Sequence, residues 1–278
     1  MYYFKPLAPE DVSARALVLS LISGAEAGPQ TIARLISAAA LFGIEASTLR
    51  VAVTRLIKEG LLESPDRGRY MPGPKAKALT RRLQDWQNVH SKLTAWNGDW
   101  LIALTHPLGR TDRKQLRARE RALTLFGYRE AETAFWVRPA NLARDLEAHR
   151  MDLVDIGADA AITLIRASSL AMPRPPDWPA LWSPGQLAEN YAAAIRAMQD
   201  SLARLPGKRA DDAAREALLI GQAVLRLINL DPLLPRELGN QADFFRMVDQ
   251  MRAYNEAGQK CWSDYHAGVQ AGVLARKD

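Results

Sequence analysis

The segment from Ala46 to Gly60 constrains the fold of this chain more than any other part of its sequence. Its apolar residues recur at intervals of three and four, the spacing of one face of an α-helix, and are Leu49, Val53, Leu56 and Ile57. The remaining positions carry hydroxyl, arginine and lysine side chains, which hydrogen-bond to phosphates and base edges. We therefore predict a helix that packs through one face and presents a hydrogen-bonding face to solvent.

Two shorter amphipathic helices are predicted before this segment. Ser13 can cap the first, which ends near Gly24, because its side-chain oxygen can accept a hydrogen bond from a free amide of the first turn. The second helix is predicted to begin after Gly28, with Pro29 in its first turn, where the missing amide hydrogen does no harm.

A basic hairpin is predicted after the third helix. Leu61–Ser64 and Arg69–Met71 have the pattern of strands, and Pro65–Gly68 has turn residues. Three helices followed by such a hairpin indicate a winged helix-turn-helix, which we assign to residues 1–74.

In a winged helix, the third helix enters the DNA major groove, and the hairpin reaches the flanking backbone or minor groove. Arg50 is the first candidate for a base contact, because arginine bound to guanine is the commonest specific pairing. For Arg55 and Lys58, a phosphate contact and a solvated surface charge are both open. The predicted DNA-binding residues are Ser47, Thr48, Arg50, Val51, Thr54, Arg55, Lys58, Arg67 and Arg69.

Charge is distributed unevenly along the 278 residues, whose formal net charge is +6. Up to Thr94 there are 13 Lys and Arg against 8 Asp and Glu, whereas the remainder has 24 against 23. This excess in the first third suits a polyanionic partner such as double-stranded DNA, and a basic solvated face without a partner is the alternative.

The sequence also limits the class of protein. It has neither a signal peptide nor about 20 consecutive apolar residues, and its single cysteine, Cys261, excludes an internal disulfide. We therefore expect a cytoplasmic protein without membrane contact. The four histidines lack ligand spacing, and no catalytic motif appears, so neither an enzyme nor a metal or cofactor site is predicted.

Three regions are predicted beyond the N-terminal domain, which makes the fold class α+β. Residues 75–95 form a connecting helix, residues 96–172 a ferredoxin-like β-α-β-β-α-β domain, and residues 173–278 an all-α domain for effector binding and dimerisation. The middle domain is predicted to contain strand Trp100–Leu104, helix Arg113–Phe126, strands Tyr128–Glu132 and Ala134–Arg138, helix Asn141–Arg150 and strand Ala161–Ile165. The three C-terminal helices are predicted at Gln186–Leu205, Asp211–Leu230 and Gln241 to about Tyr265.

Three groups of residues carry a family resemblance. They are Thr48–Leu56 with Gly60-Leu61 and Arg67–Tyr70, then Trp96–Trp100, and then Leu227–Pro235. In this order they resemble the PaaX family of repressors of phenylacetate catabolism, from about Arg15 to Leu238. The resemblance implies a homodimer that represses a catabolic operon from a palindromic operator and is released by an aryl-CoA thioester or a related aromatic acid.

The effector is expected between the middle domain and the C-terminal helices, because aromatic residues are concentrated beyond Pro173. Its acidic groups require cations, and the candidates are Arg113, Arg117, Arg226 and Arg236.

Two other functions are considered. One is a metal-dependent nuclease built on the middle domain, with the winged helix as a substrate clamp, because the family's middle domain resembles the small nuclease of CRISPR adaptation. That nuclease holds its metal with an aspartate just after the first strand, where this chain has Thr105, His106 and Pro107. The other is a constitutive architectural or activator protein whose C-terminal helices only mediate dimerisation.

Overall fold

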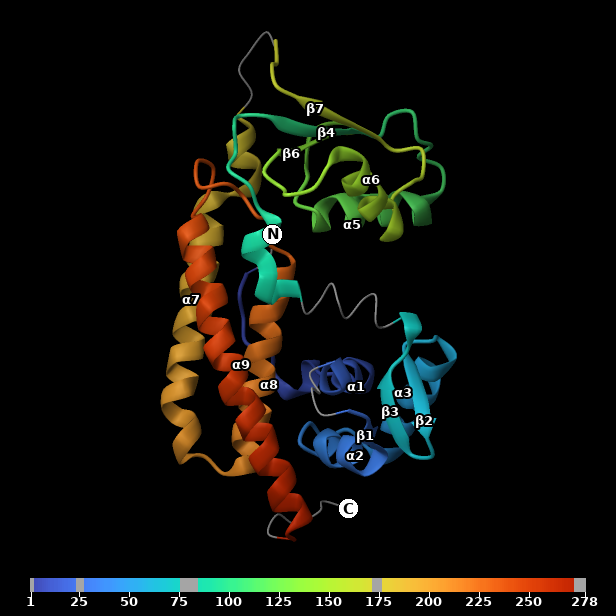
Figure 1. Cartoon of the computed structure of the whole chain (residues 1–278), viewed down its shortest axis with the longest axis vertical. Coiled ribbons are helices and arrows are strands. Elements are labelled where there is room, and N and C mark those ends of the chain that lie inside the picture. Colours follow the sequence, from blue (N-terminus) through green and yellow to red (C-terminus); the bar gives the residue numbers. More distant parts are fainter. Residues whose placement is uncertain (1–2, 24–27, 76–84, 172–176, 273–278) are drawn as a thin grey trace. The chain divides into compact units, whose positions relative to one another are not determined.

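The computed structural model describes residues 3–23, 28–75, 85–171 and 177–272 (Figure 1). Helices occur together with two small antiparallel sheets, so the predicted α+β class is confirmed. Internal contacts divide the chain into two compact units. The N-terminal unit comprises Phe4–Gln87, Ala194–Arg226 and Asp249–Asp278, and the sheet unit comprises Asn88–Ala193 and Leu227–Val248.

The N-terminal unit begins with helices α1 (Ala14–Ser23), α2 (Ile32–Ala40) and α3 (Ala46–Lys58). Their apolar faces meet in one core, which includes Leu17 of α1, Leu35 of α2 and Leu49 of α3. Ser13 caps α1 as predicted, because its Oγ accepts a hydrogen bond from the backbone nitrogen of Ala16 at 3.2 Å.

The start of the second helix was predicted too early. Pro29 lies before α2 rather than in its first turn, and the following residues form a short strand, β1 (Gln30–Thr31). The Thr31 side chain caps α2 by accepting a hydrogen bond from the backbone nitrogen of Arg34 at 3.3 Å. A threonine oxygen therefore starts this helix, and the proline does not.

The hairpin consists of β2 (Leu62–Asp66) and β3 (Arg69–Pro72), and β3 also pairs with β1, giving the antiparallel order β1-β3-β2. Asp66 pairs with Arg69, so β2 ends two residues later than predicted and the turn contains only Arg67 and Gly68. Gly68 has φ +75°, a conformation that glycine adopts without steric cost.

The connecting helix predicted over 75–95 does not extend to its predicted end: Lys75 is helical, but the last residues of the segment are not. Residues 76–84 lie outside the described residues. Asp85–Lys92 form a 3-10 helix interrupted at Asn88, and Leu93 makes an isolated antiparallel bridge with Leu142. The backbone is not helical beyond Lys92, because its next groups bond to the chain near Leu142.

The sheet unit has the predicted β-α-β-β-α-β order of elements. The elements are β4 (Trp100–Leu104), α5 (Arg113–Leu125), β5 (Arg129–Glu132), β6 (Phe135–Pro139), α6 (Leu146–Asp155) and β7 (Thr163–Ala167). All neighbouring strands are antiparallel in the order β5-β6-β4-β7. Both helices cover one face of this sheet (Figure 1), where Leu101 packs with Leu123 of α5 and Leu153 of α6.

Two elements in this unit are shifted from prediction by more than one residue. Helix α6 begins at Leu146 rather than Asn141, because Asp145 caps it by accepting a hydrogen bond from the backbone nitrogen of Ala148 at 2.8 Å. Strand β7 begins and ends two residues later than predicted, and its Ile165 pairs with Ile102 of β4.

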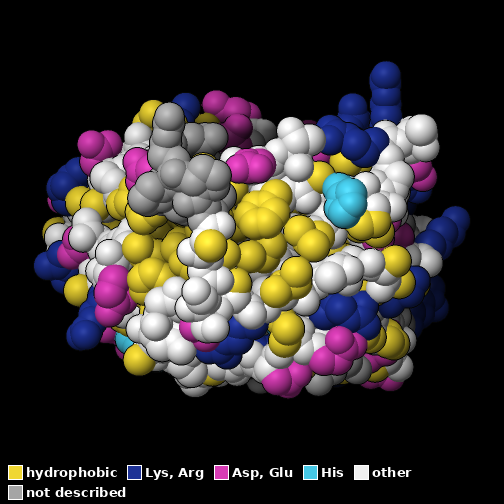
Figure 2. Space-filling view, turned by 90° about the horizontal axis from the view of Figure 1, so that it is seen from above, with side chains coloured by type: hydrophobic (Ala, Val, Ile, Leu, Met, Phe, Trp, Pro, Cys, Tyr) yellow, Lys and Arg dark blue, Asp and Glu magenta, His cyan; other side chains and the backbone are white. Residues whose placement is uncertain are grey.

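The other face of the sheet packs through Ile102 and Val137 against Trp178, Trp182 and Leu234. Figure 2 shows hydrophobic side chains gathered in the middle of the surface seen from above, with Lys and Arg side chains mainly around them. Ile165 and Leu170 are exposed large hydrophobic residues of this unit.

Three long helices follow close to the predicted positions, namely α7 (Pro184–Arg204), α8 (Ala210–Asn229) and α9 (Gln241–Gln270). Each contributes residues to both units. Within the described ranges, no helix has both the length and the apolar character needed to span a membrane.

Candidate DNA interface and effector site

One face of α3 is buried and the other is open. Leu49, Val53 and Leu56 are buried in the core that α3 shares with α1 and α2. The predicted contact residues of this helix are all exposed, and they are Ser47, Thr48, Arg50, Val51, Thr54, Arg55 and Lys58. The exposed face therefore combines two arginines, a lysine and three hydroxyl groups, which can bind phosphates and base edges.

Ile57 was predicted to face the core, and this prediction is wrong, because its side chain is 39% exposed. With about 100° of rotation per residue, Ile57 lies roughly 80° around the helix from Leu49. Leu49, Val53 and Leu56 already fill the contact with α1 and α2, so Ile57 remains at the margin of the buried face.

Thr54 uses its hydroxyl hydrogen within the helix. Its Oγ1 donates a hydrogen bond to the backbone oxygen of Arg50 at 3.0 Å. In this arrangement the hydroxyl can still accept a hydrogen bond, so the base groups it suits are the amino donors of adenine and cytosine.

The hairpin presents two exposed arginines. Arg67 occupies the turn and Arg69 begins β3. The backbone nitrogen of Ile32 donates a hydrogen bond to the Gly68 oxygen at 3.0 Å, so the tip of the hairpin is tied to the start of α2. Sequence reasoning missed β1 and this anchor, because two residues are too few to show a strand periodicity.

The four effector candidates are all exposed but do not form one cluster by sequence spacing. Arg113 and Arg117 lie one turn apart on α5. Arg236 forms an ion pair with Glu237, with 2.9 Å between Nε and Oε1. Arg226 lies on α8 in the N-terminal unit.

The Asp231–Pro235 segment, which contributed to the family resemblance, is built around a buried carboxylate. Asp231 accepts hydrogen bonds from the Tyr191 hydroxyl at 2.5 Å and from the backbone nitrogen of Leu233 at 2.8 Å. Burial raises the pKa of Asp231 to about 6, and these two hydrogen bonds limit the rise.

The same segment is fixed to the sheet by a second buried side chain. Asn141 donates from Nδ2 to the Leu233 oxygen at 2.8 Å, and its Oδ1 accepts from Nη2 of the buried Arg138 at 3.0 Å. Burial lowers the pKa of Arg138 to about 10, which still leaves it protonated at neutral pH. A Cβ added to Gly127 would lie 2.6 Å from the Pro232 oxygen, so the two backbones are in close approach.

A small cavity adjoins Asp231. Its walls include Leu187, Tyr191, Leu233 and Phe244, and its volume is about 10 Å³. This space is sufficient for one water molecule. An aryl-CoA would therefore require this cavity to widen, or a different place to bind.

Comparison with known proteins finds a family match for the segment that contains α3. Residues 13–71 match a family model described as PaaX-like protein. The N-terminal segment is therefore similar to PaaX-like proteins. This confirms the resemblance found in the sequence, and because PaaX proteins are transcription regulators that bind DNA, it supports the same class of function here.

The resemblance to a solved structure extends over nearly the whole chain. The uncharacterized protein Rv0674 from Mycobacterium tuberculosis has a TM-score of 0.63 and 25% sequence identity to it. The similarity covers 91% of this chain and 99% of that one. No curated protein matches the chain.

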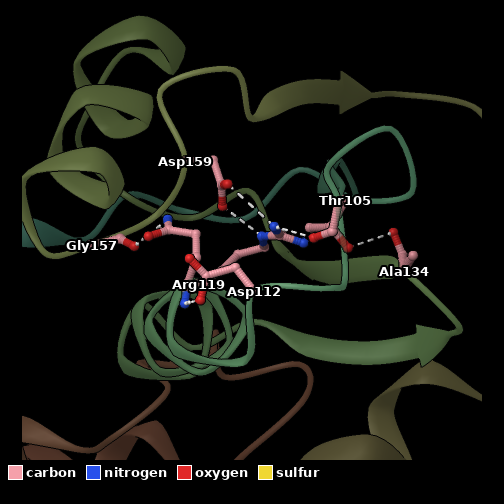
Figure 3. A network of polar contacts seen from close by, with 8 residues as sticks. Thr105, Asp112, Arg119, Ala134, Gly157 and Asp159 are labelled. Carbon is pink, nitrogen blue, oxygen red and sulfur yellow. Dashed lines mark hydrogen bonds and ion pairs between the residues drawn. The ribbon is translucent and has the colours of Figure 1, made fainter.

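Just after β4, the chain has Thr105 and no carboxylate at the strand end, and polar contacts surround this position (Figure 3). The buried Thr105 donates from Oγ1 to the Ala134 oxygen at 3.2 Å. The buried Arg119 pairs with Asp159 at 2.6 Å and donates to the Gly109 oxygen. Across the described ranges, no three His, Cys, Asp or Glu side chains are placed to hold a metal ion.

We predict that Asp231 makes stability depend on pH. Its raised pKa means that the folded chain binds this proton more tightly than the unfolded chain, whose aspartates titrate near pH 3.9. The free energy of unfolding should therefore decrease as pH rises from about 4 to 6, by on the order of 3 kcal/mol from this group.

Asp231→Asn should remove this decrease, because the amide oxygen still accepts hydrogen bonds but does not ionise. Denaturant unfolding at several pH values between about 4 and 7 measures it. Asp155→Asn, at an exposed carboxylate of α6, should keep the pH dependence of the parent. Parallel pH curves for the parent and Asp231→Asn would contradict the prediction.

Proposed function

We propose that the chain is a repressor of a catabolic operon that binds its operator through a winged helix-turn-helix in residues 1–74. One observation carries this proposal. All nine predicted DNA-binding residues are exposed on α3 and the hairpin, whereas the apolar row of α3 is buried. The order of three helices and a hairpin, with sheet order β1-β3-β2, also supports it.

The proposed contacts follow from the positions of these side chains. The first half of α3 enters the major groove, and Arg50 binds a guanine through two hydrogen bonds, while Ser47 and Thr48 bond to nearby base edges or phosphates. Arg55 and Lys58 bind phosphates farther along the helix. Arg67 and Arg69 of the hairpin bind the flanking backbone or minor groove.

The rest of the chain is assigned to regulation. Residues 75–95 connect the domains, residues 96–172 form a ferredoxin-like domain, and residues 173–278 bind the effector and mediate dimerisation. The sheet order β5-β6-β4-β7 with α5 and α6 on one face supports the ferredoxin-like assignment. A homodimer presents two copies of α3, which suits a palindromic operator.

We propose an aryl-CoA thioester or a related aromatic acid as the effector that releases DNA, bound where the middle domain meets the C-terminal helices. Arg113 and Arg117 are the best candidates for its phosphates, because they are exposed and one helical turn apart. Arg226 and Arg236 are further candidates. Release requires the effector to bind the DNA-free form more tightly than the DNA-bound form.

Arg50→Ala should abolish specific binding and leave the fold intact, because this side chain is exposed and lies outside the core. The expected loss of specific affinity is about 1–3 kcal/mol. Gel-shift titrations with a duplex selected by the full chain and with a scrambled duplex measure it. Arg144→Ala removes an exposed arginine of the sheet unit and should bind like the parent. Equal operator affinities of Arg50→Ala and the parent would remove Arg50 from the DNA interface.

Arg67→Ala together with Arg69→Ala should weaken binding to the selected and scrambled duplexes by similar factors. Each lost phosphate contact should lower the slope of log affinity against log salt by about one. Replacing both arginines with lysine keeps their charge and should preserve most of the slope. An unchanged slope in the double alanine variant would show that the hairpin does not contact the DNA backbone.

Arg113→Ala together with Arg117→Ala should weaken binding of phenylacetyl-CoA to the full chain by about tenfold or more, because each arginine loses a charge-assisted hydrogen bond to phosphate. Calorimetric titration measures the affinity, and Arg144→Ala serves as the control. If the parent binds phenylacetyl-CoA and releases DNA while the double variant binds it equally well, these arginines are not the phosphate site.

A further inference from the structure

Val51 occupies an unusual place for a valine. Its side chain is 51% exposed in the middle of α3. Neither helix propensity nor core packing explains a valine at this position. A β-branched residue lowers helix stability slightly, and an exposed side chain buries little apolar surface. The position is explained if the side chain is covered by a partner.

The helical geometry places Val51 at the centre of the exposed face. With about 100° of rotation per residue, it points roughly opposite to the buried row of Leu49, Val53 and Leu56. Ser47 precedes it by one turn and Arg55 follows it by one turn, and both are exposed.

The surroundings of Val51 indicate the chemistry of this partner. Arg50, Arg55 and Lys58 are exposed on the same helix, so the valine lies on a cationic and hydrogen-bonding surface. An apolar protein surface would have to desolvate these charges. DNA satisfies them with phosphates and guanine acceptors, and its major groove offers one apolar group, the C5 methyl of thymine.

We infer that Val51 is a specificity-determining residue that contacts the C5 methyl group of a thymine in the operator. This inference rests on the proposed DNA-binding function and adds a base that the operator must contain. Covering one methyl group corresponds to an affinity change of about three- to fivefold.

The test removes the methyl group from each partner in turn. The full chain is first used to select a binding duplex from random sequences. Each thymine of one half-site is then replaced by deoxyuridine, together with the equivalent thymine of the other half-site. Deoxyuridine differs from thymidine only in lacking the C5 methyl group. For the parent chain, one of these replacements should weaken binding about three- to fivefold per half-site. For Val51→Ala the same replacement should have no effect, and binding to the unmodified duplex should already be weaker by that factor.

Ile57→Ala is the matched control, because Ile57 is the other exposed large hydrophobic residue of α3 and lies at the margin of the buried face. This variant should retain the parent's sensitivity to deoxyuridine. Thermal unfolding should show that Val51→Ala is as stable as the parent, because alanine favours a helix and the site lies outside the core.

The outcomes separate the inference from the function on which it rests. If no thymine replacement weakens the parent, or if Val51→Ala remains as sensitive as the parent, the inference on Val51 is overturned while specific DNA binding stands. If selection enriches no sequence, and scrambled duplexes bind as tightly as any other, the proposed function and this inference both fail.

Discussion

The burial of one apolar row on α3 determines which side chains of this helix face the solvent. Leu49, Val53 and Leu56 pack in the core with α1 and α2, and complete burial of such side chains stabilises a fold by about 1.5–3 kcal/mol each. Turning α3 by one residue about its axis would expose part of this row and bury part of the polar face. The hydrophobic contact therefore sets the direction of Arg50 and Val51 without any direct interaction between those side chains and the core.

The sheet unit depends on a different kind of constraint. Arg138, Asn141 and Asp231 are buried polar side chains. Asp231 accepts a hydrogen bond from the backbone nitrogen of Leu233, and Asn141, which accepts from Arg138, donates to the Leu233 oxygen. A network of this kind is stable only when its members are satisfied together, because a single unpaired buried group costs more than its bond contributes. This requirement gives a physical reason for the residue types at Asp231–Pro235, which the sequence analysis identified only through a family resemblance.

The two constraints differ in how far the sequence could predict them. The row on α3 follows from a local periodicity, so the residues of its exposed face could be predicted without the structure, although Ile57 at the margin was misplaced. Strand β1 was missed because it is defined by pairing with β3, which lies about 40 residues away in sequence. The partners of Asp231 and Leu233 were also missed, since Tyr191 and Asn141 are brought to them by tertiary folding and follow no spacing rule.

The three C-terminal helices give the proposed regulation a physical basis. In the N-terminal unit, α9 contacts α2 directly, because the Tyr265 hydroxyl donates a hydrogen bond to the Ser37 oxygen at 2.8 Å, and Leu218 of α8 packs into the core of α1, α2 and α3. In the sheet unit, α7 provides Tyr191 to the Asp231 carboxylate, and the first turn of α9 provides Phe244 to the same cavity. An effector that displaces the first turn of α9 would act on a helix whose Tyr265 bonds to α2 in the N-terminal unit. The difference between the effector's affinities for the two forms then sets the upper limit for the loss of DNA affinity, because a ligand can shift an equilibrium only by its differential affinity.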